Sequence, residues 1–334
     1  MNENMNEIPN ENFKVNTFDE LDRFMGYMQA IKERSPLTMK EYRYDLVLFF
    51  RFLKKHMKII PADTLIEQVP INDINEDILK RIDINDFYAF ITYISIERKG
   101  SAATRARKIA SLRSFFHYLK SKRRIIIDDP TIELESPKQT RRLPKYLTLD
   151  ESKRLLISAS DATQTYSDRD YCILTLFLNC GMRLSELVNI NIKNIQEDTI
   201  KVLGKGAKER TIYLNSACIS SLDSWMAERK VFKNNKVDDA LFISRLGTRI
   251  SAKQVQIIVK KYLLNAGIDS KRYSTHKLRH TAATLMYKYG KVDIRALQQI
   301  LGHESIATTE IYTHIDSEQL HTAVESNPLA NIKK

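Results

Sequence analysis

Apolar side chains recur at helical spacing along most of this chain. In the first third the pattern predicts four helices, over residues 17–28, 38–54, 84–98 and 101–124, around a more mixed segment at 57–83. Four such helices suit a small bundle. We therefore expect a helical domain over residues 17–128. Residues 1–16, rich in Asn and Glu and without periodicity, are expected to form a disordered tail.

The rest of the chain mixes helical and strand-like patterns. An almost wholly apolar helix should end at Gly181, and further helices are expected at 148–158, 218–229, 252–266, 276–289 and 293–301. The runs 199–203 and 210–214 are strand-like and flank the turn sequence GKGAK, which predicts a hairpin. The fold class is therefore mainly α, with a mixed α/β domain over residues 148–334.

A linker is expected over residues 129–147. Three prolines punctuate it, and its charged residues near the middle are basic. Arg141 and Arg142 are candidate DNA contacts, since a cationic tether can lie along a duplex backbone. The alternative is that these charges serve only solubility.

Composition changes this picture in two ways. Lys and Arg outnumber Asp and Glu by 53 to 41, a net charge of +12, which favours a polyanion such as nucleic acid as partner. The three cysteines, Cys172, Cys180 and Cys218, are odd in number and two lie in an apolar run, so we expect reduced core thiols. There is no signal-peptide pattern and no apolar run of about 18 residues, so a soluble, cytoplasmic protein without membrane contact is expected.

The most basic part of the chain is the segment 98–124. It holds ten Lys or Arg and no Asp or Glu, whereas solvated helix faces usually mix both signs. We therefore favour contact with DNA phosphates over a merely solvated face. The candidate contacts in this segment are Arg105, Arg107, Lys108 and Arg113.

Residues 276–314 carry the densest candidate chemistry. His276 and Arg279 lie about 60° apart on one helix, off its apolar stripe, so both can reach one ligand. His303 follows Gly302, a residue type typical of helix ends. Tyr312 comes next, on a short helix that Ser305 could cap.

A phenol needs help to act as a nucleophile. With a pKa of about 10, it costs about 4 kcal/mol to ionise at pH 7. Two arginines and a histidine could offset that cost and stabilise a pentavalent phosphorus, without metal or other cofactor. His276 and His280 have the spacing of zinc ligands, but Lys277 stands where a zinc protease needs Glu, so a metal site is disfavoured.

The sequences HKLRH, LGH and TTEIYTH, at residues 276–280, 301–303 and 308–314, resemble the C-terminal signature of the tyrosine recombinases, and most of all the bacterial Xer-type enzymes. The family pattern also asks for an upstream Arg and Lys. GMRLSEL resembles the segment that bears the first catalytic arginine, here Arg183, with Glu186 holding that region in place. The hairpin lysine would be Lys205, with Lys208 as a competitor that also lies near DNA.

This resemblance implies a two-domain tyrosine-recombinase fold, with a helical, SAM-like core-binding domain and a catalytic domain. Segment 101–124 is itself similar to a helix of the core-binding domain. By the same resemblance Tyr312 attacks DNA to form a 3′-phosphotyrosyl link, His276 assists proton transfer, and Lys205 protonates the 5′-oxygen. The scissile phosphate would be held by Arg183, Arg279 and His303.

The implied partners are a double-stranded DNA target and further copies of the chain in a synaptic tetramer. A second recombinase and a DNA translocase are further candidates, and the segment after Tyr312 is expected to dock on a neighbouring protomer. Chromosome-dimer resolution is the expected role, with a mobile-element integrase as the alternative. A DNA-binding protein without chemistry and a metal-dependent nuclease are the competing classes, the latter disfavoured because the sequence shows no carboxylate cluster.

Overall fold

The computed structural model describes residues 17–61, 63–137, 145–160, 165–204, 209–232, 239–290, 292–303 and 305–312. Its contacts divide the chain into two compact units, Met1–Arg141 and Arg142–Lys334. The division falls inside the segment 129–147 for which a linker is expected. The expected tail over residues 1–16 and the segment after Tyr312 lie outside the described residues.

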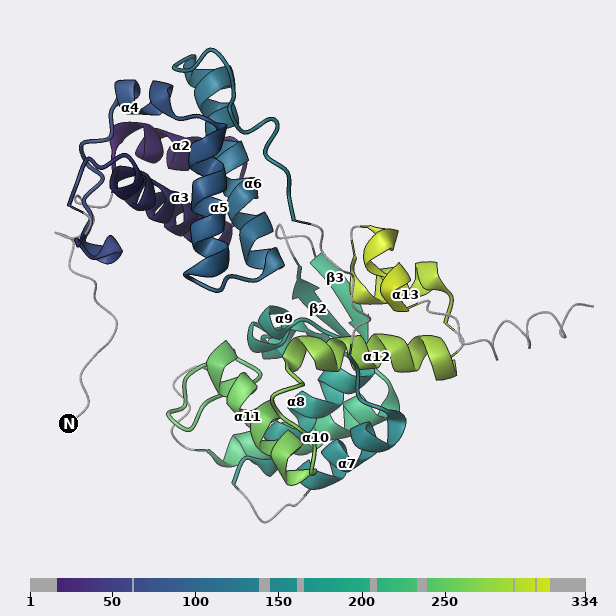
Figure 1. Ribbon diagram of the computed structural model, residues 1–334. Helices are drawn as coiled ribbons and strands as arrows, with labels where there is room; N and C mark the ends of the chain where they lie inside the picture. Colours follow the sequence, from purple (N-terminus) through teal and green to yellow (C-terminus); the bar gives the residue numbers. More distant parts are fainter. Residues whose placement is uncertain are drawn as a thin grey trace, which may run out of the picture. The chain divides into compact units, whose positions relative to one another are not determined.

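The first unit is helical (Figure 1). The four predicted helices are α2 (Asp19–Ala30), α3 (Pro36–His56), α5 (Ile84–Ile96) and α6 (Ala102–Tyr118), the last continuing into a π-helical turn, η2 (Leu119–Arg123). The mixed segment also contains a 3-10 turn, η1 (Ile66–Gln68), and a short helix, α4 (Glu76–Arg81), which were not predicted. Six residues are too few for a helical period to stand out, although Asn75 caps α4 through Ile78 N–H.

An aromatic core holds this unit together. Phe49 is fully buried and stacks on Phe87 with ring centroids 5.2 Å apart, and Phe87 meets Phe116 edge to face at 5.0 Å. Aromatic pairs at these distances add about 0.5–1.5 kcal/mol each beyond the area they bury. One face of α6 and the start of η2 is apolar and buried, since four of its residues are at most 1% exposed: Ile109, Leu112, Phe116 and Leu119.

The second unit surrounds α8 (Ser167–Cys180), which contacts α7 (Leu149–Ala159), α10 (Ser216–Val231), α11 (Ala252–Asn265) and α12 (Thr275–Gly290) (Figure 1). Its apolar side chains are buried nearly all round, as predicted. Phe177 and the Trp225 ring of α10 are both fully buried in the same core. The last α-helix described is α13 (Ile294–Leu301), expected over residues 293–301, and the Asp293 side chain caps it.

A three-stranded antiparallel sheet of order β1-β2-β3 completes this unit. The predicted hairpin is confirmed as β2 (Thr199–Leu203) and β3 (Glu209–Tyr213), with Ile200 opposite Ile212 on the buried face. A third strand, β1 (Ile195–Gln196), was not predicted because two residues carry no alternation. It follows a 3-10 turn, η3 (Ile192–Asn194).

One short helix begins at a site residue, and one predicted short helix takes another form. The short helix α9 (Leu184–Val188) begins directly after Arg183, and the Glu186 side chain accepts from the Arg183 backbone N–H at 2.7 Å. The last short helix is instead two 3-10 turns, η5 (Ile306–Thr308) and η6 (Glu310–Tyr312). Ser305 precedes the first of them without a side-chain cap.

The three cysteines are free thiols and buried, as predicted. Cys180 and Cys218 lie in the core of the second unit with sulfur atoms 3.6 Å apart. Over the described ranges, none of the helices is both long and apolar enough to cross a membrane.

Candidate active site

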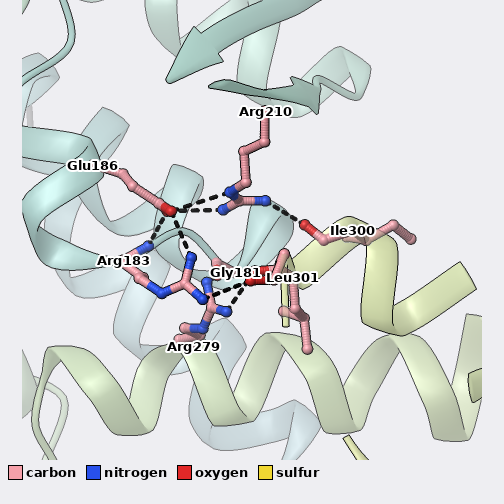
Figure 2. Close-up of polar contacts among 8 residues, drawn as sticks. Gly181, Arg183, Glu186, Arg210, Arg279, Ile300 and Leu301 are labelled. Atoms are coloured by element: carbon pink, nitrogen blue, oxygen red, sulfur yellow. Dashed lines mark hydrogen bonds and ion pairs between the residues drawn. The ribbon is translucent and has the colours of Figure 1, made fainter. Parts of the chain in front are cut away.

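Two arginines, Arg183 and Arg210, meet at the Glu186 carboxylate in the second unit, and a third, Arg279, lies beside them (Figure 2). Gly181, with φ +59°, ends α8 and turns the chain so that Arg183 starts α9. Glu186 is 2% exposed, and its carboxylate accepts from Arg183 Nη1 at 2.8 Å and from Arg210 Nη2 at 2.8 Å. Burial alone would raise the pKa of Glu186, but hydrogen bonds and charge from Arg210 and Arg183 outweigh it and lower the pKa. Glu186 is therefore an anion that holds two cations in place.

Arg183, Arg210 and Arg279 all donate hydrogen bonds to backbone carbonyls at the carboxyl end of α13. Arg279 donates to Leu301 O at 2.6 Å, Arg183 Nη2 donates to Gly302 O at 2.7 Å, and Arg210 Nη1 donates to Ile300 O (Figure 2). Carbonyls at a helix end have no partner within the helix and lie at the negative pole of its dipole. The carbonyls of residues 300, 301 and 302 thus each accept a hydrogen bond from a different arginine: Arg210 on β3, Arg279 on α12 and Arg183 at the start of α9. Arg183 and Arg279, which the sequence placed in one site, lie at adjacent carbonyls.

The buried cation among them is Arg279. It is 2% exposed and donates a second hydrogen bond to Gly181 O at 2.7 Å. Burial, followed by the charge of Arg183, lowers its pKa to about 10. A cation held in such surroundings gains from a nearby anion, which is the electrostatic condition for binding a phosphate.

Tyr312 lies beside this cluster. Its side chain is buried, and its hydroxyl is 2.6 Å from Nδ1 of His280. The Tyr312 ring also faces the His303 ring, with centroids 6.5 Å apart and planes 15° from parallel. His303 is fixed in turn by a 2.9 Å bond between its Nδ1 and the hydroxyl of the buried Thr309.

The histidines are neutral in the free protein. Burial first, and then the charges of Arg279 and Arg183, lower the pKa of His303 to about 4. Burial, with His276 and Arg279, lowers the pKa of His280 to about 4, and the pKa of His276 also falls. At pH 7 these rings act as hydrogen-bond donors and acceptors rather than as cations.

The expectation that the cations offset the cost of ionising Tyr312 is not met in the free protein. Burial raises the pKa of Tyr312 to about 12, although Arg279 opposes that rise. The phenol is therefore protonated at pH 7.

Two residues of this cluster were missed from the sequence. His280 was considered only as a metal ligand, although its spacing of four residues from His276 places both on one helix face, where their rings meet at 4.5 Å. Arg210 lies on the predicted strand β3, and its partners come from distant segments, so no local pattern marks it. In the described part of the chain, no group of three His, Cys, Asp or Glu could hold a metal ion.

Four predicted DNA contacts or site residues fall on undescribed positions: Arg141, Arg142, Lys205 and Lys208. The strands on either side of the two lysines are described. Leu203, the last residue of β2, pairs with Glu209, the first residue of β3.

Acidic residues of helix α3 pair with two basic residues of the segment 98–124. Lys108 is 3% exposed, and its ammonium group is 2.6 Å from a carboxylate oxygen of Asp45 on α3. The prediction that Lys108 contacts DNA is therefore corrected, because its charge is buried against an anion. Arg107 also binds Asp45, at 2.5 Å, and Glu41, at 2.9 Å, but keeps a third of its side chain exposed.

The other two candidates on α6 support local structure. Arg105 donates to Gly100 O at 2.7 Å and to Ser95 Oγ at 3.2 Å, and Arg113 donates to Leu134 O. Both residues are half-buried. Arg105, Arg107 and Arg113 remain proposed contacts.

Comparison with known proteins gives consistent similarities. Residues 145–319 match the phage integrase family. The chain is 52% identical to tyrosine recombinase XerC of Caldanaerobacter subterraneus subsp. tengcongensis over 312 residues, which cover 93% of this chain and 87% of that protein. It is 36% identical to tyrosine recombinase XerC of Thermodesulfovibrio yellowstonii over 324 residues, 95% of this chain and 98% of the relative.

Solved structures show the same fold. A XerH site-specific recombinase bound to its difH substrate in a pre-cleavage complex matches with a TM-score of 0.66 and 24% identity, over 92% of this chain and 83% of that one. A lambda integrase dimer bound to a COC′ core site matches with a TM-score of 0.62 and 17% identity, over 86% and 95%. These matches confirm the predicted fold class.

Proposed function

We propose a catalytic assignment from one premise: this chain belongs to the phage integrase family and is a tyrosine recombinase, an enzyme that exchanges DNA strands. The proposed nucleophile is Tyr312. The other proposed members of the site are Arg183, Lys205, His276, Arg279 and His303. The observation that carries the proposal is the convergence of Arg183 and Arg279 on adjacent carbonyls, Gly302 O and Leu301 O, next to the Tyr312 phenol.

The arginines are suited to hold the non-bridging oxygens of a scissile phosphate. A guanidinium has five N–H groups, and the hydrogen bonds given above use two in Arg279. Arg183 is 31% exposed along its side chain, so its free edge can meet a ligand. Each donor to the developing charge in the transition state is worth about 3–4 kcal/mol by analogy with oxyanion sites.

The chemistry follows from a phenol beside such a phosphate. Attack of the Tyr312 oxygen on phosphorus expels a 5′-oxygen and leaves a 3′-phosphotyrosyl link, in which the energy of the phosphodiester is retained. Lys205 is proposed to protonate the leaving oxygen, because in the sequence it lies between β2 and β3, the strand that carries Arg210. A 5′-hydroxyl from another duplex then reverses the step, so strands exchange without ATP.

The finer role that we propose is resolution of chromosome dimers in the cytoplasm. It is supported by relatives named XerC and XerD that match over at least 90% of this chain. The proposed assembly is a tetramer on DNA, as in the lambda integrase tetramer bound to a Holliday junction that shares the fold. A second recombinase and a DNA translocase are proposed as further partners.

Mapping the chromosomal sites that the protein occupies in its own cells tests this role. We expect one dominant site that supports excision between two direct copies on a plasmid. The Tyr312→Phe variant should occupy the same site and excise nothing. Occupancy confined to the ends of a mobile element would replace the proposed role by integration, and full excision by Tyr312→Phe would overturn the site.

A further inference from the structure

The phenol of Tyr312 has one described hydrogen-bond partner, and that partner is His280. The 2.6 Å distance between the hydroxyl and Nδ1 is at the short end of the range for such bonds. His280 immediately follows Arg279, so the proposed phosphate ligand and the partner of the phenol stand on one turn of α12. His276 lies one turn earlier, and its described ring contact is with His280 rather than with the phenol.

The surroundings of His280 keep its ring neutral. Burial first, and then His276, Arg279 and Lys277 from its own helix, lower the pKa of His280. Tyr312 from η6 contacts the ring, and His303, ahead of η5, lies across the phenol ring. The ring is therefore neutral at pH 7. A neutral imidazole has one donor and one acceptor nitrogen, so in the tautomer that carries its proton on Nε2 the Tyr312 hydroxyl donates to Nδ1 of His280.

We propose that His280 is the catalytic base that takes the proton of Tyr312 as the phenol attacks DNA. This inference rests on the proposed function of Tyr312 and departs from the expectation that His276 assists. In the step, the phenol O–H bond breaks and its proton moves to Nδ1, a bond forms between the phenol oxygen and phosphorus, and the bond to the 5′-oxygen breaks. The leaving 5′-oxygen is protonated by the proposed acid. In rejoining, the His280 imidazolium returns its proton to the departing phenol.

DNA itself makes His280 a better base. Burial, and after it the neighbouring groups His276, Arg279 and Lys277, hold the pKa of His280 down in the free protein, and a bound phosphate brings a negative charge next to the two cations among them. An anion beside an imidazole favours its protonated form. The base thus becomes effective only when its substrate is in place.

His280→Asn is the sharpest test, because an Asn side chain places an amide atom near the position of Nδ1 but cannot accept a proton. We expect single-turnover cleavage of a nicked duplex at pH 7 to slow by about 100-fold or more. DNA affinity and thermal stability should stay close to wild type. The matched control is His56→Asn, the same change at an exposed position on α3, which should cleave at the wild-type rate.

Three readouts separate a base from a residue that only positions Tyr312. The cleavage rate of His280→Asn should rise about tenfold per pH unit as hydroxide replaces the base. Cleavage and rejoining should slow by the same factor, so that the equilibrium fraction of covalent complex is unchanged. A substrate with sulfur in place of the bridging 5′-oxygen, which needs no protonation to leave, should not restore the rate of His280→Asn.

A second variant guards against a change in folding. In His280→Ala, added imidazole should recover part of the cleavage rate, which a purely structural loss would not allow. The inference is overturned if His280→Asn cleaves within threefold of wild type, if the 5′-sulfur substrate restores its rate, or if imidazole leaves His280→Ala unchanged. Absence of a covalent adduct with the wild-type protein would instead overturn the proposed function itself.

Discussion

Glu186 and Arg210 are joined by two hydrogen bonds, from Nε at 3.1 Å and from Nη2 at 2.8 Å, although 24 positions separate them in the chain. The pair ties strand β3 to helix α9. The same carboxylate also binds Arg183, a residue proposed to bind the phosphate. The orientation of the Arg183 side chain therefore depends, through Glu186, on the position of the sheet. The geometry of the candidate site thus rests on a buried ion cluster rather than on one helix.

Replacing Glu186 by Gln tests this dependence. The substitution keeps the shape of the side chain but leaves Arg183 and Arg210 without their buried anion. Removing one member of a buried ion pair costs about 3–5 kcal/mol, so we expect the free energy of unfolding to fall by roughly 3 kcal/mol and cleavage to slow sharply. Urea unfolding and single-turnover cleavage measure the two effects. Glu197→Gln removes the same charge from an exposed turn and should change neither.

Arg210→Lys should separate DNA binding from chemistry. Lysine keeps the positive charge but cannot contact both Glu186 and Ile300 O, since its single ammonium group lacks the guanidinium fork. The end of α13, with His303, is then less firmly placed, and we expect cleavage to slow by about tenfold or more. Affinity for DNA should change little.

Arg295→Lys, on the exposed first turn of α13, is the matched control for that variant. Equal cleavage rates in Arg210→Lys and Arg295→Lys would show that the contacts of Arg210 do not organise the site.

Gly302→Ala should disturb the site through a steric clash. Gly302 has φ +64°, and an added Cβ would lie 2.7 Å from Arg210 Cδ. The left-handed backbone alone costs about 1 kcal/mol for a residue with a Cβ, and overpacking adds about 1–3 kcal/mol. Gly267→Ala carries the backbone cost without the clash, because Gly267 has φ +70° and nothing within 4 Å of its Cβ position.

The difference between these two glycine variants therefore measures the clash. We expect Gly302→Ala to be the less stable in thermal unfolding and to cleave more slowly. Equal stability and equal cleavage would mean that Arg210 moves aside without consequence.

The comparison with the sequence shows which features are local. The helices and the β2–β3 hairpin follow from periodicity because a buried face repeats within each element. Lys108 was misjudged because its partner, Asp45, lies 63 positions away on another helix. The role of His280 was missed because its hydrogen-bond partner, Tyr312, lies 32 positions away. Tyr312 is positioned by the 3-10 turns η5 and η6, which are too short to show a periodic pattern in the sequence. The neighbourhood of Arg183 and Arg279 was predicted from family resemblance, not from spacing.

Acid should destabilise the free protein through two histidines of the candidate site, His280 and His303. Their pKa is about 4 for His280 and His303 in the fold, against about 6.5 in an unfolded chain. Between these values the unfolded chain binds more protons, so stability is present above pH 6.5 and is lost as pH falls towards 4. Thermal unfolding from pH 7 to pH 4.5 should show a steeper loss in wild type than in His303→Asn.

DNA binding should take up protons in the same pH range. A phosphate among the arginines raises the pKa of both rings towards its ordinary value. Calorimetric titration at pH 5.5, in two buffers with different ionisation enthalpies, should show net proton uptake on binding duplex. Identical heats in the two buffers would contradict a phosphate next to these histidines.

The most direct test of the account is a search for the covalent link itself. Wild-type protein is incubated in EDTA with a nicked duplex that carries its mapped site, then denatured, digested with protease and analysed by mass spectrometry. We predict a 3′-phosphate attached to the peptide that contains Tyr312, formed equally by Tyr289→Phe, an exposed position on α12, and not formed by Tyr312→Phe. An adduct on another residue, or one that survives in Tyr312→Phe, would contradict the assignment of Tyr312 as nucleophile.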